Sequence, residues 1–226
     1  MAKLNQYVLT ILLGVLVLFL NITFDPTYGN IVLWLIGLTA FAYFYHTTYE
    51  KDVEDYPVER TESNRLNSLF VALIVFIVFS FVAPILTKIF TSQTLSLTQI
   101  LSVFSSSTLI FADNKYIMVL SMVVIAVAEN NFFFGALFET IEHWAGRLVG
   151  NNWKTWATIA VTTTIFTLYH LQAKGAGGPI LFVVFLFGVT QGLLLWYYRE
   201  QKQGILNHAI TNGVAMSIAV FGLKLG

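Results

Sequence analysis

Four polar residues that could act together in hydrolysis lie in the apolar second half of the chain. Glu129 stands in "VAENNFFFG", and His170 ends the segment "FTLYH". The segment "HAITN" supplies His208 and Asn212. A carboxylate can activate water as a general base, imidazoles can shuttle protons or bind a metal, and an amide can donate to an oxyanion. These residue types indicate a hydrolytic site if the fold brings the segments together.

The positions of these residues favour a shared role but leave structural alternatives open. Glu129 lies near the middle of a predicted membrane helix, where burying a carboxylate costs about 2.5–3.5 kcal/mol. His208 and Asn212 are four residues apart, so they share one helix face and can point at one target. As alternatives, His170 or Asn212 could form ordinary hydrogen bonds between helices, and Glu129 could serve packing or a proton pathway.

Composition places the chain in a bilayer. Of its 226 residues, 57% are hydrophobic and 11% are charged, whereas globular domains have about a quarter charged. Twelve basic and twelve acidic residues cancel, which argues against nucleic-acid binding. The absence of cysteine excludes disulfides, thiol nucleophiles and cysteine–zinc sites, so any metal would need histidine and carboxylate ligands. The first apolar run, Tyr7–Phe24, is expected to be a retained helix, not a signal peptide.

The elements that must position these residues are predicted to be membrane-spanning helices. Runs of about 20 apolar residues occur at 6–24, 31–49, 66–90, 116–141, 153–172, 180–198 and 204–224. They predict an all-α, polytopic transmembrane helix bundle with seven spans and a single integral membrane domain, 1–226. The Ser- and Thr-rich segment 91–115 could be re-entrant or interfacial, which leaves eight spans as the alternative. The acidic segment 49–65 is expected to be a solvated connector.

Basic residues near the predicted span ends indicate the orientation. On the seven-span topology one side holds eight: Lys3, Lys51, Arg60, Arg65, Arg147, Lys154, Arg199 and Lys202. The other side holds four: Lys88, Lys115, Lys174 and Lys224. The larger group marks the cytoplasmic side, so the N-terminus is expected in the cytoplasm.

The order of these segments resembles the CPBP family of intramembrane proteases, which includes type II CAAX prenyl endopeptidases and bacterial Abi proteins. That family shows the motifs E-E-x-x-x-R, F-x-x-x-H and H-x-x-x-N. Here "ENNFFFG" occupies the first, "FTLYH" the second and "HAITN" the third, each in an apolar segment. The resemblance covers residues 116–226, which are expected to form the catalytic core, while residues 1–115 supply N-terminal helices and polar loops.

The first motif departs from the family pattern. Its second Glu is Asn130 here and its Arg is Phe134, while Glu129 and Gly135 are retained. On an α-helix the two changed positions are i and i+4, the spacing of a favourable Glu–Arg pair. Replacing both members of a buried ion pair can be nearly neutral, whereas removing one costs about 3–5 kcal/mol. The change therefore reads as a coordinated swap that spares Glu129, although an inactive member that later lost its second charge would look the same.

The resemblance implies a role for each site residue. Glu129 would activate water, His170 and His208 would position that water or a metal, and Asn212 would stabilise the oxyanion. One carboxylate and two histidines also resemble a catalytic zinc set, so zinc bound by His170, His208 and Glu129 remains an alternative. The substrate implied is a membrane-anchored or prenylated peptide or protein, and the location a prokaryotic cell membrane.

Three other hypotheses compete with this one. The cluster "ETIEHW" has Glu139, Glu142 and His143, but it fits neither H-E-x-x-H nor H-x-x-E-H and is expected to be an amphipathic interfacial turn. A catalytically inactive scaffold or immunity protein could retain the same fold. A proton-coupled transporter could use Glu129 and the histidines, but the chain has neither an internal repeat nor paired broken helices.

The predicted topology contains one difficulty. Helices 153–172 and 204–224 run parallel, yet His170 falls near the end of one and His208 near the start of the other. At 1.5 Å of rise per residue, this places the two imidazoles roughly 20 Å apart in depth. A wrong boundary, a short or tilted helix, or separate sites would each explain it.

Overall fold

The computed structural model describes residues 65–105, 114–171, 177–198 and 201–222, and every regular element in these ranges is helical. Four helices are long and apolar enough to cross a bilayer: Asn67–Thr91, Lys115–Leu148, Gly178–Tyr198 and Lys202–Phe221. The described part of the chain is therefore all-helical, and its apolar helices make the chain a multi-pass integral membrane protein. The predicted spans at 6–24 and 31–49 lie outside the described residues.

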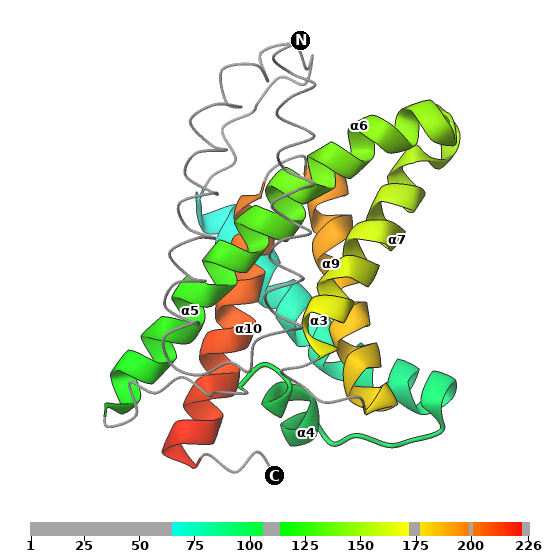
Figure 1. Ribbon diagram of the computed structural model, residues 1–226. Coiled ribbons are helices and arrows are strands. Elements are labelled where there is room, and N and C mark those ends of the chain that lie inside the picture. The colour runs from blue at the N-terminus through cyan, green and yellow to red at the C-terminus, as the bar shows by residue number, and fades with distance from the viewer. Residues whose placement is uncertain (1–64, 106–113, 172–176, 199–200, 223–226) are drawn as a thin grey trace.

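Helix α3 (Arg65–Thr91) forms one wall of the bundle (Figure 1). Three of its hydroxyl side chains are satisfied within the helix, since Ser80, Thr87 and Thr91 each donate to the backbone carbonyl four residues earlier at 2.7–2.8 Å. Such back-bonding leaves an apolar helix surface, which a bilayer requires.

The Ser- and Thr-rich segment after α3 contains one short helix. Helix α4 (Leu97–Ser102) begins at a capping box, in which Ser96 accepts from the Gln99 backbone and the Gln99 side chain accepts from the Ser96 backbone. Six residues at 1.5 Å each are far too few to cross a membrane. Within the described part of this segment, α4 therefore does not supply the eighth span.

The longest element is a continuous helix of 34 residues, longer than the predicted 116–141. It consists of α5 (Lys115–Asn131), a π-helical turn η2 (Phe132–Leu137) and α6 (Phe138–Leu148). All six residues of η2 are buried, and sequence periodicity did not predict this turn. Gly150, at φ +76°, follows α6 and is the N-cap of α7 (Asn151–Tyr169), which corresponds to the predicted span 153–172 but is more polar than the four apolar helices.

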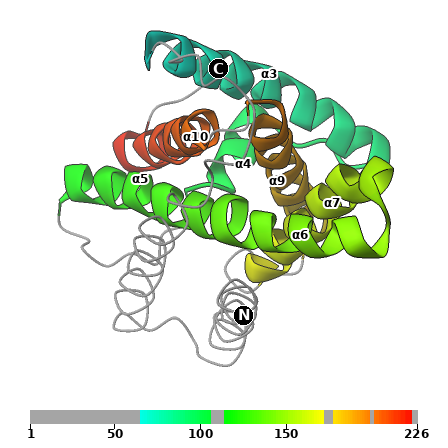
Figure 2. The ribbon, with the colours of Figure 1, turned by 90° about the horizontal axis from the view of Figure 1, so that it is seen from above.

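The remaining helices, α9 (Gly178–Tyr198) and α10 (Lys202–Phe221), lie inside the bundle. Figure 2 shows α10 between α3 and the α5–α6 helix, with α9 beside it toward α7. Gly188 and Gly192 bring α9 close to α7, because a Cβ at Gly188 would lie 2.9 Å from a Thr163 methyl and one at Gly192 would lie 3.2 Å from Ile159. Small residues four apart commonly allow such close packing in membranes.

Candidate active site

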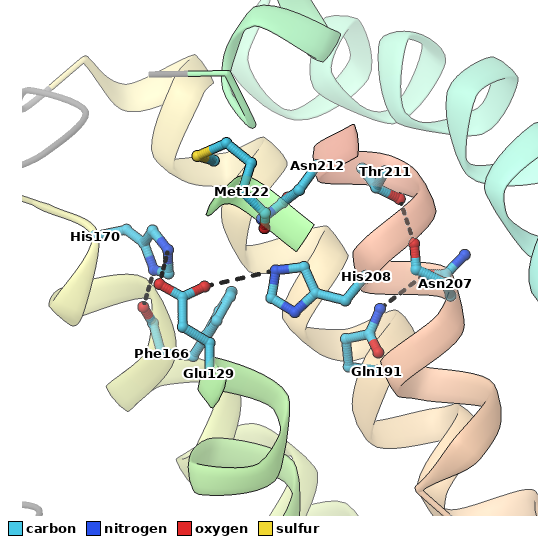
Figure 3. Close-up of polar contacts among 9 residues, drawn as sticks. All are labelled: Met122, Glu129, Phe166, His170, Gln191, Asn207, His208, Thr211 and Asn212. Carbon is cyan, nitrogen blue, oxygen red and sulfur yellow. Dashed lines mark hydrogen bonds and ion pairs between the residues drawn. The ribbon is translucent and has the colours of Figure 1, made fainter. Parts of the chain in front are cut away.

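Glu129 occupies the last turn of α5, just before the π-helical turn, and is 6% exposed. Its carboxylate points into the bundle toward α7 and α10 (Figure 3). The two predicted histidines approach opposite oxygens: His170 Nε2 lies 3.8 Å from Oε1 and His208 Nε2 lies 3.5 Å from Oε2. The structure thus brings together three polar residues that lie far apart in the sequence.

The hydrogen bond made by His170 decides which of its ring nitrogens carries a proton. Its Nδ1 lies 2.8 Å from the Phe166 carbonyl oxygen, and because a carbonyl only accepts, Nδ1 must donate. In the neutral ring Nε2 is then an unprotonated acceptor that faces the acceptor oxygen Oε1 of Glu129. At 3.8 Å the two atoms are too far apart for a direct hydrogen bond.

His208 is held by aromatic rings on α7 and α9. It is 1% exposed, and its ring meets Phe187 at 4.9 Å and Phe166 at 6.1 Å in edge-on geometry. Phe166 also contacts the His170 ring at 4.4 Å. The phenylalanine of the second motif therefore packs against both imidazoles.

The expected depth separation of His170 and His208 is not present, because both reach one carboxylate. The predicted helix bounds were close to those of α7 and α10, so the boundaries do not explain the difference. Figure 1 shows that α7 starts beyond the start of α10, where α6 projects from the bundle. This offset brings the end of α7 to the level of the second turn of α10, and the assumption of equal starting depths was wrong.

Asn212 shares the His208 face of α10 but has a different partner. It is 4% exposed, and its Nδ2 donates to the Met122 carbonyl on α5 at 3.5 Å (Figure 3). That distance is at the long limit for a hydrogen bond, so the amide can exchange this acceptor at small cost.

The two altered positions of the first motif face different neighbours. Phe134 packs against Phe166 with ring centroids 5.4 Å apart. Asn130 is 1% exposed and lies against Gly204 of α10. The π-helical turn begins at Phe132, so it starts between positions 130 and 134.

Sequence reasoning missed Tyr169 as a site residue. It is 7% exposed, its side chain hydrogen-bonds to Glu129, and its ring contacts Phe133 at 4.9 Å and His170 at 4.8 Å. Nothing in the motif pattern singled it out, since the position before the histidine is variable in F-x-x-x-H. Its proximity to Glu129 depends on where α7 ends.

Among the described residues no group of three or more His, Asp or Glu side chains is placed to hold a metal ion. The zinc alternative for Glu129, His170 and His208 stays a prediction. The competing cluster on α6 makes structural contacts instead, with Glu142 paired to Lys154 of α7 at 3.7 Å and Arg147 lying over the Trp144 ring at 5.2 Å.

Comparison with known proteins adds one finding. Residues 111–214 match the family model described as type II CAAX prenyl endopeptidase Rce1-like. The matched stretch contains Glu129, His170, His208 and Asn212, and it confirms the predicted resemblance. No curated protein and no solved structure matches the chain significantly.

Proposed function

Since residues 111–214 form an Rce1-like type II CAAX prenyl endopeptidase domain of the CPBP family, we propose that the chain is an intramembrane endopeptidase. It hydrolyses a peptide bond near the membrane surface. The observation that carries this proposal is the buried Glu129 carboxylate between the imidazoles of His170 and His208. A carboxylate kept in an apolar helix and flanked by two bases suits general-base activation of water.

The site residues divide the reaction between them. A water between Glu129 Oε1 and His170 Nε2 donates one hydrogen to each acceptor, which leaves an oxygen lone pair free to attack the scissile carbonyl. Glu129 takes the proton as the new C–O bond forms and the carbonyl electrons move onto its oxygen. Asn212 Nδ2 leaves the Met122 carbonyl and donates to this oxyanion. The C–N bond then breaks, and Glu129 returns the proton to the leaving nitrogen.

The substrate we propose is a membrane-anchored or prenylated peptide or protein. The family description supports prenylated substrates in general. A lipid-anchored chain is also already in the bilayer plane, from which a site buried between membrane helices can be reached. We further propose the seven-span topology in a prokaryotic cell membrane, with α7 as a span, the N-terminus in the cytoplasm and residues 116–226 as the catalytic core.

The test is turnover of a panel of fluorogenic membrane-proximal peptides, with and without a prenyl group, by the purified protein. Removing a general base typically costs about 10²–10⁴-fold, so we expect Glu129→Gln to lose activity on that scale. We expect His208→Ala to lose activity too, because its imidazole lies 3.5 Å from Glu129 Oε2 and helps to hold this carboxylate. Glu142→Gln is the matched control, because this acid is paired with Lys154 away from the site. Elemental analysis of the same preparations tests for metal.

A non-catalytic scaffold or immunity protein is the second candidate. The observation that favours it is the presence of Asn130 and Phe134 where the family has an acid and an arginine. Equal turnover by wild type and Glu129→Gln would rule out catalysis by this carboxylate, and no turnover with any peptide would favour the scaffold.

A further inference from the structure

Beside the Glu129 site lies a second set of buried polar side chains that the proposed chemistry does not use. Asn130 on α5, Gln191 on α9 and Asn207 on α10 are each 1% exposed. Asn130 directly follows Glu129 in the sequence, and Asn207 directly precedes His208. Gln191 forms a hydrogen bond with Asn207. We call these three the amide ladder.

The donor and the acceptor can be assigned in both hydrogen bonds of the amide ladder. The Ala72 carbonyl on α3 only accepts, so the Asn207 Nδ2 that lies 3.1 Å away must donate to it. Asn207 therefore presents its Oδ1 to Gln191, whose Nε2 donates at 2.7 Å (Figure 3). Gln191 Oε1 must then point away from Asn207. The Ala72 carbonyl on α3 therefore determines the orientation of the Asn207 amide, and through it the orientation of the Gln191 amide.

The far end of Gln191 and the side chain of Asn130 both lie against Gly204. A Cβ on Gly204 would lie 2.9 Å from Gln191 Oε1 and 3.1 Å from Asn130 Nδ2, so both side chains lie against the bare backbone of α10. Any larger residue would displace one of them. Gly204 is therefore the place where α5, α9 and α10 come together.

This junction lies one helical turn from the Glu129–His208 contact. Gly204 and His208 are four residues apart on α10, and Asn130 directly follows Glu129 on α5. A shift of α5 relative to α10 at Gly204 would therefore change the separation of the Glu129 oxygens from His208 Nε2, now 3.5 Å at its shortest.

We propose that the amide ladder is a positioning device that sets the distance between Glu129 and His208, with Gln191 as its central positioning residue. The hydrogen bonds from Gln191 to Asn207 and from Asn207 to Ala72 join neutral groups, so they need no counter-ion inside a bilayer. Asn130 takes part by packing at Gly204. The catalytic part of this inference rests on the proposed protease function, whereas the geometric part does not.

The geometric part is tested by a distance measurement that does not depend on activity. The chain has no cysteine, so spin labels can be placed at Val78→Cys on α3 and Val124→Cys on α5, both exposed positions on helices that flank α10. We expect Gln191→Leu to shift or broaden the label distance measured by pulsed electron paramagnetic resonance. We expect Gly204→Ala to change the label distance too, because its methyl group would press on Gln191 and Asn130 from α10. This second variant keeps the test valid if Gln191→Leu folds poorly.

Gln203→Leu is the matched control. Gln203 is also a 1% exposed amide on α10, but its Nε2 donates to Ser68 on α3 at 3.4 Å and takes no part in the amide ladder. We expect its label distance to equal that of the unsubstituted chain. An unchanged distance in Gln191→Leu and Gly204→Ala, or an equal change in all three variants, would overturn the proposal.

The catalytic part is tested by separating kcat from KM. A misplacement of about 1 Å can cost roughly 100-fold in rate, so we expect Gln191→Leu to lower kcat by about 10- to 100-fold with KM nearly unchanged. A rise in KM alone would overturn the positioning role. If the wild-type protein hydrolyses no peptide, the proposed function fails, and the label distances still decide whether the amide ladder sets the geometry.

Discussion

At the scale of single residues, Phe166 explains why the second motif has its spacing. Its carbonyl accepts from His170 Nδ1, and its ring packs on both imidazoles. The backbone N–H of His170 turns to the Thr167 carbonyl at 3.0 Å, which leaves the Phe166 carbonyl free for the side chain. The sequence placed Phe166 and His170 in one motif, F-x-x-x-H. It could not show that α7 ends at Tyr169, and this ending makes the bond possible.

Tyr169 gives a prediction at the same scale. Tyr169→Phe removes the hydroxyl that hydrogen-bonds to Glu129 and keeps the ring contacts with Phe133 and His170. A hydrogen bond to a charged group is worth about 1.5–3 kcal/mol, so we expect kcat to fall by roughly 10- to 150-fold. Peptide turnover checks this, with Tyr197→Phe, an exposed position, as the control. Equal rates for both variants would exclude a role of the hydroxyl.

At the scale of helices, the sequence predicted the existence of each described long helix but not its internal irregularities. Four predicted spans correspond to α3, the α5–η2–α6 helix, α9 and α10, because long apolar runs have few other structures available in a bilayer. The π-helical turn was missed since three phenylalanines, Phe132 to Phe134, are apolar in any helical register. Asn130 lies just before that turn and packs against Gly204, whereas Phe134 lies within the turn.

The contact between α7 and α9 gives a prediction at this scale. A methyl group at Gly188 would lie 2.9 Å from the Thr163 side chain and 3.5 Å from its Cα, so Gly188→Ala must push α7 away. Overpacking of this kind costs about 1–3 kcal/mol, and because His170 ends α7 we expect peptide turnover to fall as well. Thermal unfolding in detergent measures the first effect.

Gly178→Ala is the control for Gly188→Ala. It lies on the same helix, and a Cβ there meets no atom within 4 Å. We expect its stability to be unchanged or higher by up to about 1 kcal/mol. If Gly188→Ala and Gly178→Ala unfold at the same temperature, the close approach of α7 and α9 does not determine stability.

At the scale of the whole molecule, the basic residues that the predicted topology places on one side of the membrane lie at one end of the bundle, as far as the structure describes them. Figure 1 shows the start of α3, the α6–α7 corner and the start of α10 at one end of the bundle. The basic residues of these segments are Arg147, Lys154 and Lys202, with Arg65 at the start of α3. Lys88 and Lys115 lie at the other end, near the end of α3 and the start of α5. These basic residues therefore divide between the two ends of the bundle as the predicted topology has them, and which end faces the cytoplasm stays a prediction.

Labelling of single cysteines tests this sidedness, because the chain has no native cysteine to interfere. Tyr116 and Leu148 are 76% and 81% exposed and lie at opposite ends of the 34-residue helix. With the larger basic group in the cytoplasm, Tyr116→Cys should react with a membrane-impermeant maleimide in intact cells, and Leu148→Cys only after permeabilisation. The reverse pattern would invert the orientation and leave the span intact. Reaction of both from outside would mean that this helix, which carries Glu129, does not cross the bilayer, and a general base inside the membrane could not then be maintained.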